Sequence, residues 1–269
     1  MDNLLSRIIY SGDIKQLIEK ALLEFNLGDL VNFEIIQTGF EDLNVKVTTD
    51  KNYFIKFFAS SGERSECERY IQIVESAIQA NVSTPKLIQN KDGASLINVD
   101  NVNLAVFEYI EGTTIPEDYS FNDDQITFLA DQCLKITNLA PRTSSLEPIY
   151  DSWAVVNFRQ EYPKKVKLLD IDLRKVINPV LGAFGRIKLE TLPRSFVHGD
   201  IRKLNVIIDK EDRLWITDFG VSNNYPRVVE PAVILSNLLF NPNDLEVTKS
   251  YKEKFIEEYS KLIPLTEEE

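Results

Sequence analysis

Residues 195–220, SFVHGDIRKLNVIIDKEDRLWITDFG, constrain the fold of this chain more than any other stretch. The apolar runs 206–208 and 214–216 predict two short buried strands, and the polar residues between them predict a turn. When such strands pair as a β-hairpin, the residues before the first strand come close to those after the second. The sequence therefore predicts a hairpin with two polar loops meeting at its open end.

Polar side chains occupy both of those loops. Asp200 and Asn205 share the loop before the first strand, and Asp218 follows the second strand. Asn205 and Asp218 offer oxygen ligands, which suit Mg²⁺, an ion that keeps several waters and takes one or two protein ligands beside nucleotide phosphates. Asp200 would remain to orient an attacking hydroxyl group and to accept its proton. The same residues could instead lie on the surface of an ordinary hairpin, since a loop motif alone is only a hypothesis.

The order and spacing of these residues resemble kinase active sites. His198-Gly199-Asp200 with Asn205 downstream, followed by Asp218-Phe219-Gly220, is similar to the H-R-D-x-x-x-x-N and D-F-G loops of protein kinases. Glycine in the second position resembles the superfamily of aminoglycoside phosphotransferases, choline kinases and homoserine kinases, whose loop reads H-G-D-x-x-x-x-N. This resemblance implies an α+β, two-lobed protein-kinase-like fold with a small β-rich N-lobe and a larger helical C-lobe.

The resemblance also implies the bounds of the two lobes and the function of each. Residues 1–109 would form the N-lobe, with the nucleotide-binding sheet and a helix. Residues 110–269 would form the C-lobe, with the catalytic loop, the metal site and the helices that bind the acceptor. In this superfamily, backbone groups of the hinge hydrogen-bond the adenine edge, which implies an ATP base pocket at Glu108, Tyr109 and Ile110.

Lys56 is the expected phosphate-binding cation. It lies in the apolar run YFIKFF, where a lysine is costly to bury unless its charge is matched. It could otherwise lie on the solvent face of an edge strand. The resemblance implies that Lys56 contacts the α- and β-phosphates and pairs with a glutamate of the helix predicted at 63–80. Glu66, Glu68 and Glu75 compete for that role, and Glu68 is our choice because it directly precedes the apolar stripe of the helix.

Further phosphate contacts are expected from a turn and from the catalytic loop. Gly39 could let the backbone approach a phosphate closely, and together with Asn44 it resembles the phosphate-binding turn of the small-molecule kinases. An ordinary hairpin would look much the same. Arg202 stands where protein kinases usually carry a lysine that touches the transferring phosphoryl group. It could therefore stabilise charge on the γ-phosphate, or it could simply be exposed to solvent.

The composition narrows the classes of function. A net charge of −12 argues against nucleic acid as a partner, because phosphates demand a basic surface. The same charge suits a cationic acceptor drawn in by electrostatic steering, although many acidic proteins are simply soluble. One histidine and two cysteines cannot assemble a zinc site of the usual four nitrogen and sulfur ligands. His198 is instead expected to brace the backbone of the loop that carries Asp200.

Localisation is predicted from what the sequence lacks. No apolar run approaches the roughly 18 residues that suggest a membrane span. The first residues, MDNLLSRIIYSGD, lack the basic start, long apolar centre and cleavage site of a secretory signal. Cys67 and Cys133 need not pair, and a reducing compartment is the simplest setting. We therefore expect a cytoplasmic protein without a membrane partner.

The remaining elements are predicted from apolar periodicity. Strands are expected within 33–49, 53–58 and 104–109, and helices at 14–25, 63–80, 123–139, 162–176, 232–239 and 251–262. Pro163 would lie in the first turn of its helix, where proline is tolerated. The largely helical segment between Gly112 and His198 suits the antibiotic and metabolite kinases, which place extra helices here to build the acceptor site.

The predicted reaction is transfer of the γ-phosphoryl group of ATP, with Mg²⁺, to a hydroxyl group of a small molecule. Aminoglycosides, choline-like amines, homoserine-like amino acids and sugars all remain open as acceptors, and the acidic balance favours an amine-bearing one. Protein kinase activity is not expected, because no A-P-E motif follows Gly220 and the remaining chain is too short for a protein kinase helical lobe.

Other classes of function remain open. A nucleotide-binding pseudokinase could act as a scaffold or regulator, since residues 201–204 and Glu230 depart from the superfamily pattern. A metal-dependent hydrolase could use Asp200 and Asp218, but it would need neither Lys56 nor a hinge. ATP consumption across a panel of hydroxyl compounds would distinguish a kinase from the pseudokinase. ATP binding would distinguish a kinase from the hydrolase.

Overall fold

The computed structural model describes residues 6–8, 10–37, 41–59, 63–139, 146 and 149–269. The chain forms two compact units: residues 1–114 with 207–217, and residues 115–206 with 218–269. The first unit runs past the predicted boundary at Tyr109 and takes in most of the hairpin, which that boundary leaves in the C-lobe. An antiparallel sheet in the first unit and helices in the second confirm the α+β class.

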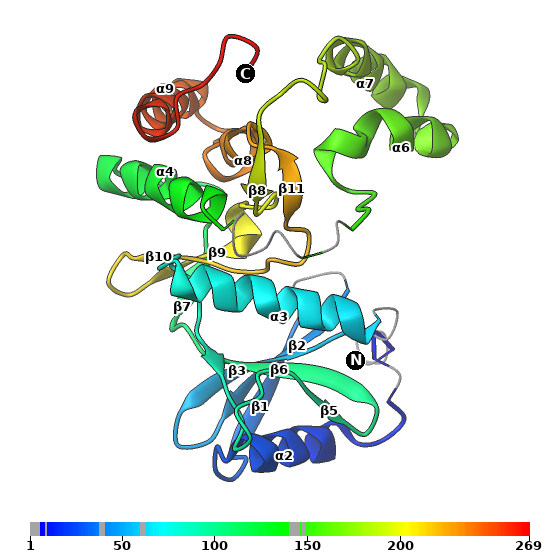
Figure 1. Cartoon of the computed structure of the whole chain (residues 1–269), viewed down its shortest axis with the longest axis vertical. Coiled ribbons are helices and arrows are strands. Elements are labelled where there is room, and N and C mark those ends of the chain that lie inside the picture. Colours follow the sequence, from blue (N-terminus) through cyan, green and yellow to red (C-terminus); the bar gives the residue numbers. More distant parts are fainter. Residues whose placement is uncertain (1–5, 9, 38–40, 60–62, 140–145, 147–148) are drawn as a thin grey trace. The chain divides into compact units, whose positions relative to one another are not determined.

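The sheet of the first unit is antiparallel throughout (Figure 1). Its strands are β1 (Asn32–Ile36), β2 (Leu43–Thr48), β3 (Asn52–Phe57), β4 (Leu87–Ile88), β5 (Ile97–Val99) and β6 (Val102–Glu108). The order is β1-β2-β3-β6-β4, with β5 also paired to β6. In this register Lys56 lies opposite Asn44 of β2 and Ala105 of β6.

The hydrophobic core of the first unit lies against one face of this sheet. The helix predicted at 14–25 is confirmed as α2 (Ile14–Phe25), which begins at the N-cap residue Asp13. Its buried stripe joins alternate residues of β2 and β3, among them Val45 and Ile55, in one hydrophobic cluster. Because successive side chains of a strand point to opposite faces, Asn44 and Lys56 lie on the face away from this cluster.

The predicted hairpin is also present in the structure. β9 (Val206–Asp209) neighbours β10 (Leu214–Ile216), and β7 (Gly112–Thr114) pairs with the other side of β9. Gly112 is needed because a Cβ atom there would lie 2.2 Å from a carbonyl oxygen of β9. The carboxylate of Asp209 accepts hydrogen bonds from the backbone N–H groups of Glu211 and Arg213 and from the Trp215 indole, which closes the turn.

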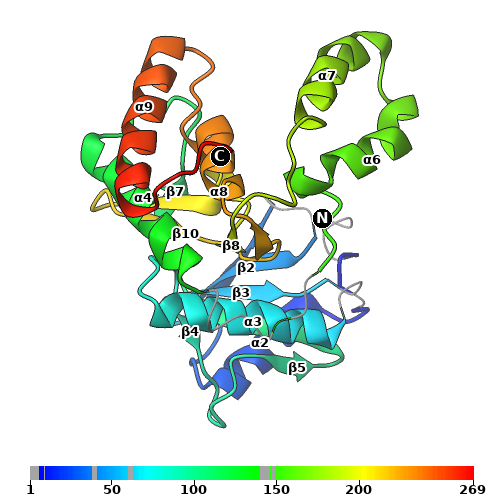
Figure 2. The same cartoon turned by 45° about the horizontal axis from the view of Figure 1, so that its top comes forward.

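The second unit is mainly helical (Figure 1, Figure 2). Its elements are α4 (Asp123–Thr137), η1 (Val155–Asn157), α6 (Phe158–Lys165), η2 (Val166–Leu168), α7 (Ile171–Phe184), β8 (Arg194–Val197), η3 (Lys203–Asn205), β11 (Asn223–Pro226), α8 (Val229–Val233), η4 (Ile234–Leu238) and α9 (Leu245–Leu262). β8 pairs antiparallel with β11, and α4 packs against α9. Both views show α6 and α7 as a pair set apart from α4, α8 and α9. None of the helices in the described residues is long and apolar enough to cross a membrane.

The structure corrects the predicted helix at 162–176. Two helices occupy that region, because the Asp170 side chain caps a new helix by accepting the N–H groups of Asp172 and Leu173. Pro163 lies inside α6 rather than in the first turn of its helix. The helix predicted at 232–239 is divided into α8 and the π-helix η4, and the last helix begins earlier than predicted, at the N-cap residue Asp244.

Candidate active site

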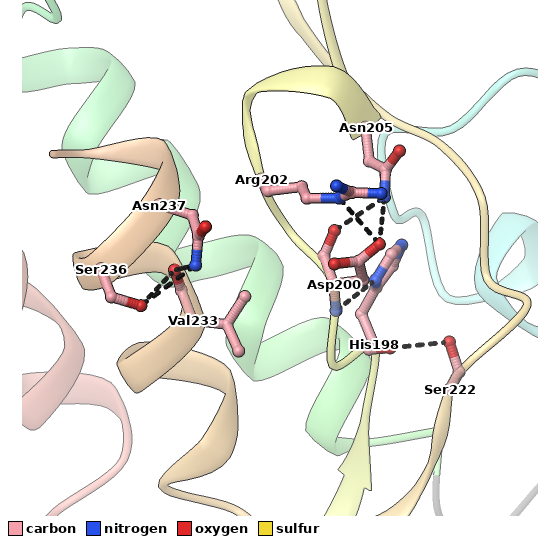
Figure 3. Close-up of polar contacts among 8 residues, drawn as sticks. All are labelled: His198, Asp200, Arg202, Asn205, Ser222, Val233, Ser236 and Asn237. Atoms are coloured by element: carbon pink, nitrogen blue, oxygen red, sulfur yellow. Dashed lines mark hydrogen bonds and ion pairs between the residues drawn. The ribbon is translucent and has the colours of Figure 1, made fainter. Parts of the chain in front are cut away.

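Residues 198–205 of the second unit form the candidate catalytic loop, hereafter the catalytic loop, which is built around His198 (Figure 3). This side chain is fully buried, and its ring lies 4.5 Å from that of Phe219, measured between centroids. Its Nδ1 accepts the backbone N–H of Asp200 at 3.2 Å, and its carbonyl oxygen accepts the Ser222 hydroxyl at 3.2 Å. His198 therefore links the loop to the segment that follows Asp218, as expected of a bracing residue.

Asp200 is held by two side chains from its own loop (Figure 3). The amide nitrogen of Asn205 donates to the Asp200 carbonyl oxygen at 3.0 Å and to Oδ2 of its carboxylate at 2.6 Å. The Arg202 Nε donates to the same Oδ2 at 3.0 Å. The short helix η3 turns Asn205 back towards Asp200. The structure thus brings together three residues that we predicted for the site, and it places Arg202 directly on the Asp200 carboxylate.

The charge of Asp218 affects the pKa of Asp200. Burial raises the pKa of Asp200 above its ordinary value, Arg202 and Asn205 lower it, and the charge of Asp218 raises it further. Asp218 follows β10 with a φ of 67°, in the left-handed region that aspartate tolerates better than most residues. The carboxylates of Asp200 and Asp218 therefore repel each other within the second unit, a repulsion that a bound cation would relieve.

The donor set suits Mg²⁺ better than a transition metal. Across the described residues, no three His, Cys, Asp or Glu side chains gather in a group that could hold a metal ion. A magnesium site would therefore depend on the Asp218 carboxylate and the amide oxygen of Asn205, whose amide nitrogen points to Asp200. One or two such oxygen ligands, completed by phosphate oxygens and water, are what Mg²⁺ takes in nucleotide sites.

Glu230 of α8 holds the backbone of the loop by hydrogen bonds. Its Oε2 accepts the backbone N–H of His198 at 2.5 Å and that of Gly199 at 3.2 Å. Gly199 has a φ of 79°, which disfavours any other residue at this bend. Burial raises the pKa of Glu230 to about 7, although both backbone donors lower it. Sequence reasoning placed Glu230 at an acidic position of the superfamily, where aspartate is more usual, but it did not predict the contact of Glu230 with the loop.

The helix that continues from Glu230 lies next to the catalytic loop (Figure 3). Val233 packs against the cluster of Val197 and Val229, which ties this helix to the strand that leads into the loop. Beyond it, Ser236 and Asn237 of η4 are exposed and hydrogen-bond back onto the carbonyl groups of their own helix. π-Helical turns often occur at functional sites, so this surface is a candidate for acceptor contacts.

In the first unit, Lys56 pairs with Asp42. The Lys56 Nζ lies 2.6 Å from Oδ2 of Asp42 and 5.0 Å from the centre of the Tyr70 ring. The other oxygen of Asp42 accepts the Ala59 N–H at 2.8 Å. Lys56 is only 5% exposed, and the carboxylate of Asp42 matches its charge inside the unit. Sequence reasoning missed Asp42, whose signal was its place two residues before Asn44, the residue that faces Lys56 across the sheet.

The predicted partner Glu68 has a different contact. Its Oε1 accepts a hydrogen bond from Nε of Arg64 at 2.8 Å, and both side chains are about half exposed at 50% and 56%. Glu75, another of the competing glutamates, accepts the Ser95 hydroxyl at 2.8 Å. The pairing of Lys56 with Glu68 stays a prediction that this geometry does not favour.

The other nucleotide residues are placed as follows. Asn44 lies beside Lys56, and its Oδ1 is buried without a hydrogen-bond partner in the described part of the chain. Gly39 lies outside the described residues. At the end of β6, the Glu108 N–H donates to the Lys86 carbonyl, and the Lys46 Nζ lies 4.2 Å from the centre of the Tyr109 ring. Ile110 follows, partly buried.

Comparison with known proteins agrees with this geometry. Residues 32–265 match the model of the phosphotransferase enzyme family. The homoserine kinase of Zymomonas mobilis is 20% identical over 248 residues, which cover 90% of this chain and 75% of the relative. The homoserine kinase of Methylobacillus flagellatus is 19% identical over 253 residues, covering 94% of this chain and 77% of the relative.

Solved structures share the fold. A spectinomycin phosphotransferase in complex with ADP and spectinomycin has a TM-score of 0.71 at 14% identity, covering 89% of this chain and 78% of that one. The choline kinase of Streptococcus pneumoniae has a TM-score of 0.64 at 19% identity, covering 95% and 83%. The fold is therefore that of the aminoglycoside-kinase-like proteins. This chain belongs to the phosphotransferase enzyme family, and it is a kinase that phosphorylates a hydroxyl group of a small molecule.

Proposed function

We propose that this kinase transfers the γ-phosphoryl group of ATP, in a reaction that requires Mg²⁺, to the hydroxyl group of an amine-bearing antibiotic or metabolite. The observation that carries the proposal is the cluster in which Asn205 and Arg202 both hydrogen-bond the Asp200 carboxylate while Asp218 acts on its pKa. Such a cluster combines a base (Asp200), a cationic side chain (Arg202) and candidate metal ligands (Asn205 and Asp218), which phosphoryl transfer needs.

Asp200 acts on the acceptor. Its carboxylate orients the hydroxyl group and takes the proton as the hydroxyl oxygen forms its bond to the γ-phosphorus and the bond to the bridging oxygen of ADP breaks. Burial favours this role because it raises the pKa of Asp200 and so makes the carboxylate a better proton acceptor. Arg202, which touches the same carboxylate, stabilises charge on the transferring group.

The proposal also assigns a role to each residue expected to contact the nucleotide or its metal ion. Asn205 and Asp218 would hold Mg²⁺, which would supply positive charge to neutralise the phosphates of ATP. Lys56 contacts the α- and β-phosphates, and its pairing with Asp42 supports this role by keeping a buried ammonium group oriented. Asn44 and Gly39 belong to the phosphate-binding turn, Glu68 remains a candidate to fix Lys56, and the backbone at Glu108, Tyr109 and Ile110 contacts the base.

An amine-bearing acceptor is supported by two observations. The net charge of −12 attracts cations. Similar proteins are named for homoserine, choline, spectinomycin and aminopropanol, and another was solved in complex with kanamycin. Each of these molecules carries a hydroxyl group and a nitrogen that is positively charged at neutral pH. The shared chemistry, rather than any one of these molecules, is what we assign to this chain.

The proposal is tested by measuring ADP formation from ATP and Mg²⁺ with a panel of amino alcohols, homoserine and aminoglycosides. We expect turnover with at least one acceptor and a loss of about a thousandfold or more in kcat for Asp200→Asn, since the base is removed. Asp124→Asn, the same change at an exposed position of α4, serves as the matched control and should behave as wild type.

The other outcomes have distinct meanings. Binding of ATP without turnover of any acceptor would favour the pseudokinase alternative. Equal turnover by Asp200→Asn and wild type would remove Asp200 from the catalytic role. Phosphate release from esters without any ATP binding would point to the hydrolase.

A further inference from the structure

Glu230 makes an uneven set of contacts for a buried carboxylate. It is 2% exposed, and both backbone donors of the catalytic loop, from His198 and Gly199, bind the same oxygen, Oε2. Oε1 is buried as well, and it has no hydrogen-bond partner within the described residues. A buried carboxylate with only one satisfied oxygen is costly to keep ionised, because water cannot reach the other oxygen.

Among the described residues, the groups that act on the charge of Glu230 include no compensating cation. The groups whose charges couple to it are Asp200 on the loop, Cys133 on α4 and Tyr259 on α9. The first is an acid, and burial raises the pKa values of the other two, so they stay neutral. Arg227, just before α8, donates to the Glu269 carboxylate through Nε at 2.8 Å and through Nη2 at 2.7 Å.

We propose that the ionisation of Glu230, whose carboxylate holds the backbone that leads to Asp200, makes turnover depend on pH. In the ionised state, Oε2 accepts two charge-assisted hydrogen bonds, which hold the bend that carries Asp200. In the neutral state the proton occupies Oε1, the oxygen without a partner, and the two hydrogen bonds to Oε2 lose their charge assistance. Burial places this change near neutrality, because it raises the pKa of Glu230 to about 7.

The expected consequence for catalysis has a definite sign. Turnover should rise with pH as Glu230 ionises, with a midpoint near the pKa of about 7. Losing the charge assistance of two hydrogen bonds costs on the order of a tenfold change in rate, so the alkaline plateau should lie about tenfold above the acid one. This consequence depends on the proposed kinase reaction, whereas the titration of Glu230 does not.

The experiment uses the full chain and compares Glu230→Gln with wild type. Glutamine keeps the size and an acceptor oxygen but cannot ionise. The backbone amide resonance of Gly199 should shift with pH around neutrality in the wild type and stay constant in Glu230→Gln. The pH profile of kcat should lose its rise in the variant and stay near the acid plateau. Glu161→Gln, a change at another buried glutamate that lies on α6, is the matched control and should keep both behaviours.

The two readouts separate failure of this inference from failure of the proposed reaction. If the Gly199 resonance titrates in the wild type but no acceptor is phosphorylated, the proposed reaction fails and the ionisation of Glu230 stands. A Gly199 resonance that titrates equally in Glu230→Gln, or a pH profile of kcat that keeps its rise in that variant, overturns the inference, because another group must then titrate.

Discussion

At the scale of single residues, this kinase places charged side chains where burial alone would disfavour them. Lys56 is 5% exposed and is matched by Asp42, whose second oxygen is held by the Ala59 N–H. Asp200 is matched by Arg202 and Asn205 in its own loop. Each pair orients a functional group by hydrogen bonds from its neighbours, which is how a site keeps its geometry before the substrate binds.

Replacing Asp42 with asparagine should weaken ATP binding. The change leaves the Lys56 ammonium group buried with a neutral partner, and removing one member of a buried pair costs about 3 kcal/mol or more of stability. We expect roughly a tenfold weaker Kd for ATP with Mg²⁺ by calorimetry, because the lysine is no longer held for the phosphates. The exposed Asp29→Asn is the control. An unchanged ATP affinity in Asp42→Asn would separate Asp42 from the phosphate site.

At the scale of elements, the hairpin β9–β10 shows how a turn can be secured by one side chain. Asp209 receives hydrogen bonds from the backbone at Glu211 and Arg213, from the Arg213 side chain and from the Trp215 indole. Burial tends to raise the pKa of Asp209, but these donors outweigh it and lower the pKa to about 2. Asp218 follows β10, the second strand of this hairpin, in the sequence.

Asp209 should therefore make the stability of this kinase depend on acid pH. A carboxyl group with a lowered pKa stabilises the folded state above its ordinary pKa of 3.8 and loses that effect as the pH falls through about 2. Asp209→Asn should lower the Tm at neutral pH by several degrees, and the difference from wild type should shrink towards pH 2. Thermal unfolding followed by circular dichroism measures both. A difference that stays constant with pH would contradict the assignment.

Several elements could be predicted from the sequence and others could not. The helix 14–25 and the hairpin strands follow from apolar periodicity, which reports burial on one face. The break between α6 and α7 was missed, because the apolar pattern continues through Leu168 and Ile171 while the Asp170 cap interrupts the backbone hydrogen bonds. Local capping decided that boundary, and periodicity does not detect it.

At the scale of the whole molecule, we expect Glu230 of the second unit to make folding and catalysis respond to pH in opposite directions. Glu230, Cys133 and Tyr259 come from α8, α4 and α9, and all three side chains are buried. Ionisation of Glu230 strengthens its hydrogen bonds to the catalytic loop. The same ionisation costs stability, because burial disfavours the charged form of Glu230.

The stability of the wild type should fall as the pH rises. The folded pKa of Glu230, about 7, lies above its ordinary value of 4.5, so the folded state binds more protons between these values and stability decreases across that window. Glu230→Gln should remove this part of the decrease and should be more stable than wild type at pH 8 (Tm higher by a few degrees). Tm values of both proteins across this pH range test it, and parallel curves would rule it out.

The sequence by itself determined the family and the α+β class, and it predicted the loop residues proposed to carry the chemistry. Each of these depends on a local pattern: two linked motifs at a set spacing and alternating or helical apolar residues. Only the tertiary structure decided which carboxylate meets Lys56 and which one holds the catalytic loop. Asp42 and Glu230 reach their partners across a sheet and from a separate helix, and such contacts depend on packing between segments far apart in the chain. A single sequence does not by itself say which acidic residue makes each of these contacts.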